Sequence, residues 1–204
     1  MIPYFVSALG GYVLGSIPLG YLLVKFRSRV DIRTSGSGNV GAFNAGIVTG
    51  STAVGITVGL LDASKGFVAT LGAWLVFGLF WPAALAMLGS VVGHIAPVWL
   101  RWKGGRGLAT ACGALFSIGL GFTIVWCTLW AVCKWQKQPI LTSNLIATVA
   151  TPVILVLMPS QLIDAVMTTE TTSAEYRILA FCLTALLLVS HRDSLKEYRE
   201  ERIS

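Results

Sequence analysis

Charged residues are scarce in this sequence. Of its 204 residues only 12% are Asp, Glu, Lys or Arg, while 55% are hydrophobic and the mean hydropathy is +0.76. Soluble domains carry charge on roughly a quarter of their residues, so this composition excludes a soluble protein and predicts an all-α integral membrane protein. At about twenty residues per crossing, the length allows about six or seven spans in a single multi-spanning domain over residues 1–204.

Cysteine is also rare, and it lacks the spacing of a metal or redox motif. The four cysteines lie in or beside apolar segments, with no C-x-x-C pair and no nearby histidine cluster: Cys112, Cys127, Cys133 and Cys182. We therefore interpret them as small apolar residues and predict no metal site.

Acidic residues are outnumbered by basic ones, which gives a formal net charge of +6. The basic residues lie in short clusters between apolar runs, and this favours a cytoplasmic membrane face and anionic substrates over nucleic acid. Lys25, Arg27, Arg29 and Arg33 follow the first apolar run, whereas a secretory signal would carry its charge before that run. We therefore predict that the N-terminus lies outside and this basic loop inside.

Apolar runs divide the chain into candidate crossings, at residues 2–24, 52–81, 82–100, 107–133, 140–159 and 174–190. The run 107–133 is too long for one ordinary span and too short for two. Two half-spans forming a re-entrant hairpin would keep Lys134 and Lys137 inside with the basic C-terminal tail. Residues 160–175 contain acidic residues and no Lys or Arg, as expected of an external loop. Arg177 is the one exception to this charge pattern.

Two features interrupt the apolar runs. Pro18, in Gly15-Ser16-Ile17-Pro18, removes a backbone hydrogen bond, so the first helix is expected to break or kink there. Asp62 and Lys65 are three residues apart, which puts both on one face of a membrane helix. Ionisable residues in such segments are costly and usually face a site or cavity. A kink of little function and a structural ion pair that fixes helix packing are the alternatives.

A first polar loop, residues 34–44, alternates glycines with hydroxyl and amide side chains. Such a loop can fold into a nest of backbone amides, and Ser37, Asn39 and Asn44 can supply further donors. A flexible linker is the alternative, although a linker does not need the paired asparagines.

A second polar stretch, His94–Thr110, begins where a long apolar run stops. Glycines at positions 104, 105 and 107 allow positive φ and can turn amide hydrogens toward one small volume, to which Lys103 and Arg106 bring positive charge. The pattern predicts an anion site. A solvated juxtamembrane loop that follows the positive-inside rule is the alternative.

Taken together, these motifs resemble the bacterial membrane glycerol-3-phosphate acyltransferases that use acyl-phosphate as donor. The matching residues span most of the chain: Gly15-Ser16-Ile17-Pro18, Gly36-Ser37-Gly38-Asn39 with Gly41-Ala42 and Asn44, Asp62, Lys65-Gly66, Gly93-His94, Pro97, Lys103-Gly104-Gly105-Arg106-Gly107 and, more weakly, His191-Arg192. The resemblance implies about seven transmembrane helices, some short or broken, in the bacterial plasma (inner) membrane. It also implies an outside N-terminus, a cytoplasmic C-terminus and a cytoplasmic catalytic face.

The reaction that the resemblance implies transfers the acyl group of acyl-phosphate to the 1-hydroxyl of glycerol 3-phosphate and releases phosphate, with no metal or organic cofactor. Both substrates and the membrane lipids are then the expected partners, and an enzyme that produces acyl-phosphate is a candidate functional partner.

The resemblance also assigns candidate site residues. Ser37, Lys103 and His191 are the expected catalytic residues, with His191 binding phosphate or orienting the hydroxyl. The residues expected to support the site are Asp62, Lys65 and His94. The expected substrate-binding residues are Gly36, Gly38, Asn39, Asn44, Gly104, Gly105, Arg106, Ser143 and Ser194.

Three positions and one short segment depart from the family's usual pattern. Phe43 stands where Thr is usual, Ile47 lies near a usual Arg, Ser194 replaces a usual Asn, and residues 140–143 read Ile-Leu-Thr-Ser in place of Ser-Leu-Ala-Ser. Loss of the Arg removes a bidentate phosphate partner, and Ser reaches less far than Asn. These changes motivate a second hypothesis, a relative that binds a phosphorylated ligand without turnover. A small-solute transporter built on the intramembrane charges is a third.

Overall fold

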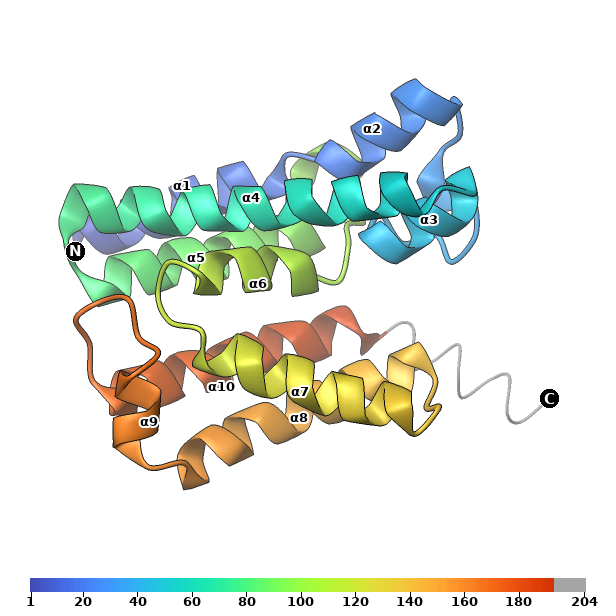
Figure 1. Cartoon of the computed structure of the whole chain (residues 1–204). Coiled ribbons are helices and arrows are strands. Elements are labelled where there is room, and N and C mark those ends of the chain that lie inside the picture. Colours follow the sequence, from blue (N-terminus) through green and yellow to red (C-terminus); the bar gives the residue numbers. More distant parts are fainter. Residues whose placement is uncertain (193–204) are drawn as a thin grey trace. The chain divides into compact units, whose positions relative to one another are not determined.

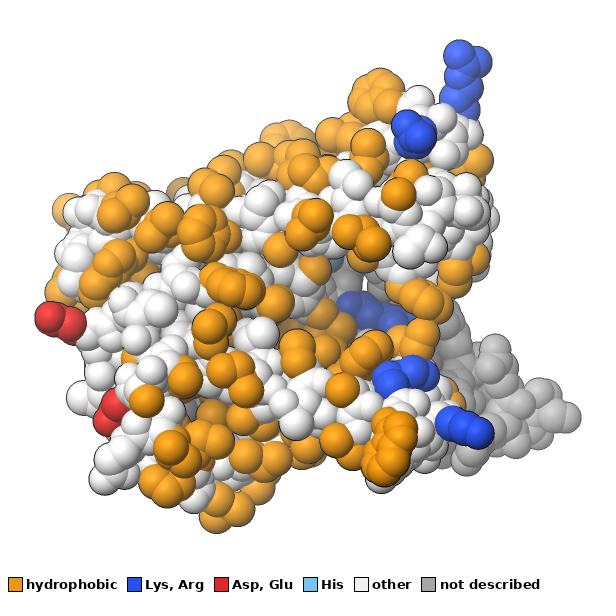
Figure 2. Space-filling view, in the orientation of Figure 1, with side chains coloured by type: hydrophobic (Ala, Val, Ile, Leu, Met, Phe, Trp, Pro, Cys, Tyr) orange, Lys and Arg blue, Asp and Glu red, His pale blue; other side chains and the backbone are white. Residues whose placement is uncertain are grey.

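The computed structural model describes residues 1–192 as helices joined by turns and loops (Figure 1). Within these described residues, five segments are long and apolar enough to cross a membrane: Ile2–Ser28, Thr52–Phe77, Phe80–Leu100, Ile140–Leu157 and Ser173–Ser190. Hydrophobic side chains cover much of the face seen in Figure 2, as expected of a surface that contacts lipid. The prediction of an all-α integral membrane protein is confirmed, while the count of about seven spans and the sides of the termini stay predictions.

The chain divides into two compact units, Met1–Ser117 and a second unit from Ile118 onward. Whether residues 1–204 act as a single domain stays a prediction. The first unit contains α1 (Ile2–Ser16), α2 (Leu19–Ser28), the 3-10 turn η1 (Ile32–Thr34), α3 (Ala42–Thr49), α4 (Thr52–Phe77), α5 (Phe80–Ile95), the 3-10 turn η2 (Val98–Leu100) and α6 (Leu108–Leu115).

Glycines allow α1 and α5 to cross at close range. A Cβ atom added at any of four glycines would meet backbone atoms of the opposite helix: Gly11, Gly15, Gly89 and Gly93. Helices in lipid associate through such close van der Waals packing, because a helix surface that moves from lipid to another helix gains little hydrophobic free energy. The crossing places the end of α1 directly beside the last turn of α5.

A small apolar core holds the polar loops of the first unit in place. It joins α2, η1, α3, α4 and η2 through side chains that are at most 7% exposed: Val24, Ile32, Val40, Ala45, Val54, Val58 and Leu100. The loop between η1 and α3 is therefore anchored at both ends.

The second unit contains α7 (Gly121–Trp135), α8 (Ile140–Leu157), α9 (Ser160–Asp164) and α10 (Ser173–Ser190). Two indole hydrogen bonds join the α7–α8 hairpin: Trp126 Nε1 donates to Thr148 Oγ1 (3.0 Å), and Trp130 Nε1 donates to Asn144 Oδ1 (2.8 Å). The helix break at residues 116–120 confirms that the run 107–133 is divided into two short segments. Their re-entrant arrangement stays a prediction.

Arg177, the exception to the charge pattern, has partners within its own unit. Its Nε donates to the carbonyl oxygen of Leu155 (3.0 Å) and its Nη2 to that of Met158 (2.8 Å). The last carbonyls of a helix lack intrahelical donors and carry partial negative charge. Arg177 therefore caps the C-terminal end of α8.

Candidate active site

The break in the first membrane segment lies where Pro18 predicted it. α1 ends at Ser16, α2 begins at Leu19, and the carbonyl oxygen of Ile17 accepts hydrogen bonds from Leu19 N (3.0 Å) and Lys65 Nζ (3.3 Å). The helix break thus gives the buried ammonium group of Lys65 a backbone acceptor. This role argues against the alternative of a kink with little function.

Asp62, Lys65 and His94 form a buried group, which we call the Asp62 cluster. Lys65 Nζ lies 3.0 Å and His94 Nδ1 lies 3.4 Å from the same carboxylate oxygen, Asp62 Oδ1. All three residues are at most 7% exposed. Because an isolated charge is costly to bury, each charge is retained here only beside its partner. The ion pair between Asp62 and Lys65 is confirmed, and the His94 ring lies against the same carboxylate oxygen.

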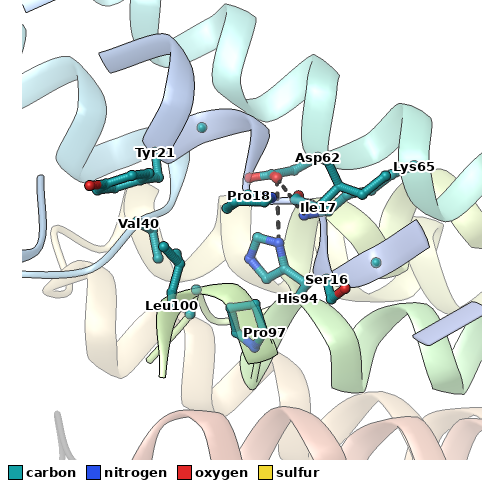
Figure 3. A pocket seen from close by; sticks show the side chains of 14 residues that line it. Ser16, Ile17, Pro18, Tyr21, Val40, Asp62, Lys65, His94, Pro97 and Leu100 are labelled. Atoms are coloured by element: carbon teal, nitrogen blue, oxygen red, sulfur yellow. Dashed lines mark hydrogen bonds and ion pairs between the residues drawn. The ribbon is translucent and has the colours of Figure 1, made fainter. Parts of the chain in front are cut away.

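A small pocket, partly open to solvent, lies beside the Asp62 cluster (Figure 3). In Figure 3 the His94 ring points toward Asp62, while Tyr21, Val40 and Leu100 lie on the side away from Lys65. The lining also includes backbone of the helix break and of the glycines at 104 and 105. Motifs that are far apart in sequence therefore meet at one end of the first unit.

Asn44 organises the first polar loop. It lies in α3 and is 2% exposed; its Nδ2 donates to the carbonyl oxygens of Ile32 (3.1 Å), Ser35 (3.0 Å) and Asn39 (2.8 Å), and its Oδ1 accepts from Ser37 N (2.9 Å). These contacts occupy its donors, so the arrangement favours loop support over the predicted direct binding of substrate.

The loop has left-handed glycines, as a nest would, but its amides donate within the loop and to α3: Ser37 N to Asn44 Oδ1, Gly38 N to the carbonyl oxygen of Ser35, and Gly41 N to Asn39 Oδ1. A nest that offers free amides to an anion therefore stays a prediction. Gly36 and Gly38 adopt φ of 59° and 68°, a left-handed conformation that glycine enters without steric cost. Ser37, between them, is exposed. Ser37 is thus placed where a ligand in solution can reach it.

The second polar stretch differs from the prediction in one respect. Of the glycines at 104, 105 and 107, only Gly107 adopts positive φ (81°). The amides of Gly104 and Gly105 donate to the carbonyl oxygens of Ile95 and His94, both at 3.0 Å. Amide hydrogens held in this way do not point at a bound anion. Lys103 is exposed and Arg106 is half-buried, so the positive charge of the stretch remains accessible.

Glycine is required at these two positions for a steric reason. A Cβ at Gly104 would meet the carbonyl oxygen of His94, and a Cβ at Gly105 would meet the imidazole ring of His94. The two glycines therefore permit close packing against the end of α5.

The other predicted site residues belong to the second unit. His191 is 1% exposed and follows α10; its Nδ1 lies 2.7 Å from the carbonyl oxygen of Leu187, so Nδ1 carries the proton. Ser143 is fully buried, and its Oγ donates to the carbonyl oxygen of Pro139 (2.9 Å). Ser194 lies outside the described residues.

A polar clamp beside the pocket was not predicted. Arg33 donates to Asp31 through Nε (3.0 Å) and Nη2 (2.7 Å), and its guanidinium lies 4.8 Å from the centre of the Tyr21 ring. Lys25 Nζ donates to the same tyrosine's hydroxyl (2.9 Å). The hydrogen bonds from Arg33 lower the pKa of Asp31 to about 2. The Asp-x-Arg spacing was the available signal, but only the fold places Tyr21 beside it.

Phe43 and Ile47, two of the unusual positions, lie on one face of α3, where they are 61% and 55% exposed. Their side chains offer phosphate no polar contact.

Comparison with known proteins identifies relatives along the whole chain. A family model described as glycerol-3-phosphate acyltransferase matches residues 5–201. The glycerol-3-phosphate acyltransferase of Pelagibacter ubique (strain HTCC1062) is 33% identical over 202 residues, which cover 97% of this chain and 95% of that protein. That of Rhodopseudomonas palustris (strain BisB5) is 36% identical over 197 residues, which cover 96% of this chain and 93% of that protein.

Solved structures of an integral membrane glycerol 3-phosphate acyltransferase also match the chain. The chain matches the crystal structure of PlsY (YgiH), an integral membrane glycerol 3-phosphate acyltransferase, in its glycerol 3-phosphate form, with a TM-score of 0.80 and 29% identity over 98% of this chain and 93% of that one. Its lysophosphatidic acid form matches with a TM-score of 0.77, at the same identity and coverage.

Proposed function

Because the chain belongs to the glycerol-3-phosphate acyltransferase family, we propose that it transfers an acyl group from acyl-phosphate to the 1-hydroxyl of glycerol 3-phosphate. The products are 1-acyl-glycerol 3-phosphate (lysophosphatidic acid) and phosphate. The observation that carries this proposal is the meeting of the helix break, the Asp62 cluster and the 97–105 stretch around one pocket in a chain with this family membership.

The site offers what two phosphorylated substrates require. Lys103 is exposed next to the lining residue Gly104 and supplies a cation for charge-assisted hydrogen bonds. The half-buried Arg106 follows the lining residue Gly105, and the left-handed turn around Ser37 supplies polar groups. Acyl-phosphate is already activated, so catalysis rests on positioning and on stabilising the leaving group. The hydroxyl oxygen bonds to the acyl carbon, the bond from that carbon to the phosphate oxygen breaks, and the hydroxyl proton passes to the departing phosphate. Ser37, Lys103 and His191 remain the proposed catalytic residues.

The proposed setting is the bacterial inner membrane, with the active face in the cytoplasm. There the acyl tail of the donor lies in the bilayer, and an enzyme that makes acyl-phosphate supplies the substrate. The basic clusters on the connections Lys25–Arg33 and Lys134–Lys137 support this orientation.

The test uses the purified protein in lipid, given palmitoyl-phosphate with and without glycerol 3-phosphate. Phosphate and lysophosphatidic acid that form only with both substrates support the proposal. Product formed from palmitoyl-coenzyme A, but not from palmitoyl-phosphate, overturns the proposed donor. No product from folded protein with intact donor overturns the proposed reaction.

A relative that binds without turnover is the second candidate, favoured by the exposed apolar pair Phe43 and Ile47 in place of phosphate ligands. This candidate requires that glycerol 3-phosphate raise the melting temperature of the protein while no product forms.

A further inference from the structure

We propose that the Asp62 cluster positions the segment Lys103–Gly107 for the phosphorylated substrate, acting through the imidazole and the carbonyl oxygen of His94. This inference rests on the proposed function for its kinetic consequence. The coupling of the His94 side chain to the path of the segment Lys103–Gly107 follows from the contacts in the structure and does not depend on the proposed function.

The segment Lys103–Gly107 caps the C-terminal end of α5. This helix ends at Ile95, and the carbonyl groups of its last turn lack intrahelical donors. Gly104 N donates to the carbonyl oxygen of Ile95 and Gly105 N to that of His94, both at 3.0 Å. The backbone between the two candidate phosphate cations, Lys103 and Arg106, is thereby fixed to the helix end.

The His94 ring sets how closely the segment can approach. A Cβ at Gly105 would meet the imidazole at Nε2, so the ring and the glycine are in direct apposition. A rotated or displaced ring would occupy the volume that the backbone of Gly105 now borders.

The ring has a fixed orientation. His94 Nδ1 faces Asp62 Oδ1 at 3.4 Å, and Lys65 Nζ holds the same oxygen at 3.0 Å while it also donates to the carbonyl of Ile17. Figure 3 shows these groups converging on the wall of the pocket. One carboxylate therefore links α4, α5 and the helix break to the segment that carries the cations.

The experiment compares two amide replacements of the histidine in lipid nanodiscs. His94→Asn keeps a donor near the position of Nδ1, and His94→Gln places its amide near Nε2 instead. Asp62→Asn removes the carboxylate charge. Ser90→Ala is the matched control, because it removes a buried hydroxyl from α5 whose acceptor is Met87, within the same helix.

The main readout is hydrogen exchange at the amides of Gly104 and Gly105. We expect faster exchange in His94→Gln and Asp62→Asn, and near-native exchange in His94→Asn and Ser90→Ala. The KM for glycerol 3-phosphate is expected to rise about tenfold in the first two variants, with a smaller change in kcat, because the cations are displaced and not removed.

Unchanged exchange in His94→Gln and Asp62→Asn overturns the inference, whatever happens to KM. Faster exchange along the whole of α5 also overturns it, because that result indicates general unfolding of the helix. If the protein shows no acyl transfer, the exchange result still decides this inference, and only the proposed function fails.

Discussion

At the residue scale, Asn44 shows how one buried amide can define a loop. Its side chain contacts three carbonyls and one amide, so Asn44→Ala leaves several backbone groups without partners. We expect the free energy of unfolding to fall by about 1–3 kcal/mol, measured by chemical denaturation in detergent. Asn39→Ala, which removes a single accepted hydrogen bond, serves as the milder control. A fully stable Asn44→Ala protein with lost activity would instead indicate direct substrate contact.

Among the proposed catalytic residues, Lys103 is the one whose replacement is expected to change the rate in a readily measured way. Lys103→Ala is predicted to lower the rate of acyl transfer about 100-fold, because it removes a cation proposed to stabilise the leaving phosphate. Arg27→Ala removes the same charge from another exposed position of the first unit and is expected to leave the rate unchanged. Equal rates for the two variants would show that the assigned role of Lys103 is wrong.

The Asp31–Arg33 clamp has a pH dependence with a defined sign. The pKa of Asp31 is lowered from 3.8 to about 2, so the ionised carboxyl favours the folded state above its unfolded pKa. That contribution is lost as the pH falls through the folded pKa, between about 4 and about 2. We expect the stability difference between the wild type and Asp31→Asn to be constant above pH 5 and to close below about pH 4, in unfolding measured across this range. A difference that keeps its full size from pH 5 down to pH 2 contradicts this account.

At the element scale, the crossing of α1 and α5 depends on glycine. Gly11→Ala would place a Cβ against the backbone of Ala86, so we expect a loss of about 1–3 kcal/mol in stability. Gly10→Ala, one residue away, meets nothing within 4 Å and is expected to be neutral or slightly stabilising. Thermal unfolding of both variants in detergent measures the contrast, and equal losses would argue against close packing as the cause.

At the scale of the whole molecule, the charge pattern predicts the topology. Gln136→Cys lies beside Lys134 and Lys137 and is expected to be cytoplasmic, whereas Glu170→Cys lies in the acidic connection and is expected outside. In a variant without the four native cysteines, an impermeant maleimide applied to intact cells should label only Glu170→Cys. Labelling of both positions from outside would overturn the orientation.

Much of the fold was predictable because lipid imposes simple rules on sequence. Apolar length located the helices that cross, Pro18 located the break, and the three-residue spacing of Asp62 and Lys65 located the ion pair. The amides of Gly104 and Gly105 were misjudged, because glycine signals conformational freedom or close approach equally well, and only the packing against α5 selects the second. His94 was expected to support the site together with Asp62 and Lys65, but its contact with Asp62 was not predicted, because His94 comes from another helix.

The capping of α8 by Arg177 has a consequence for how the protein is made. A guanidinium group that enters the bilayer must find acceptors there, and its acceptors are the carbonyls of Leu155 and Met158. Those carbonyls emerge from the ribosome before α10 does. We therefore expect α10 to be more stable in the bilayer when α8 is already there to supply these acceptors.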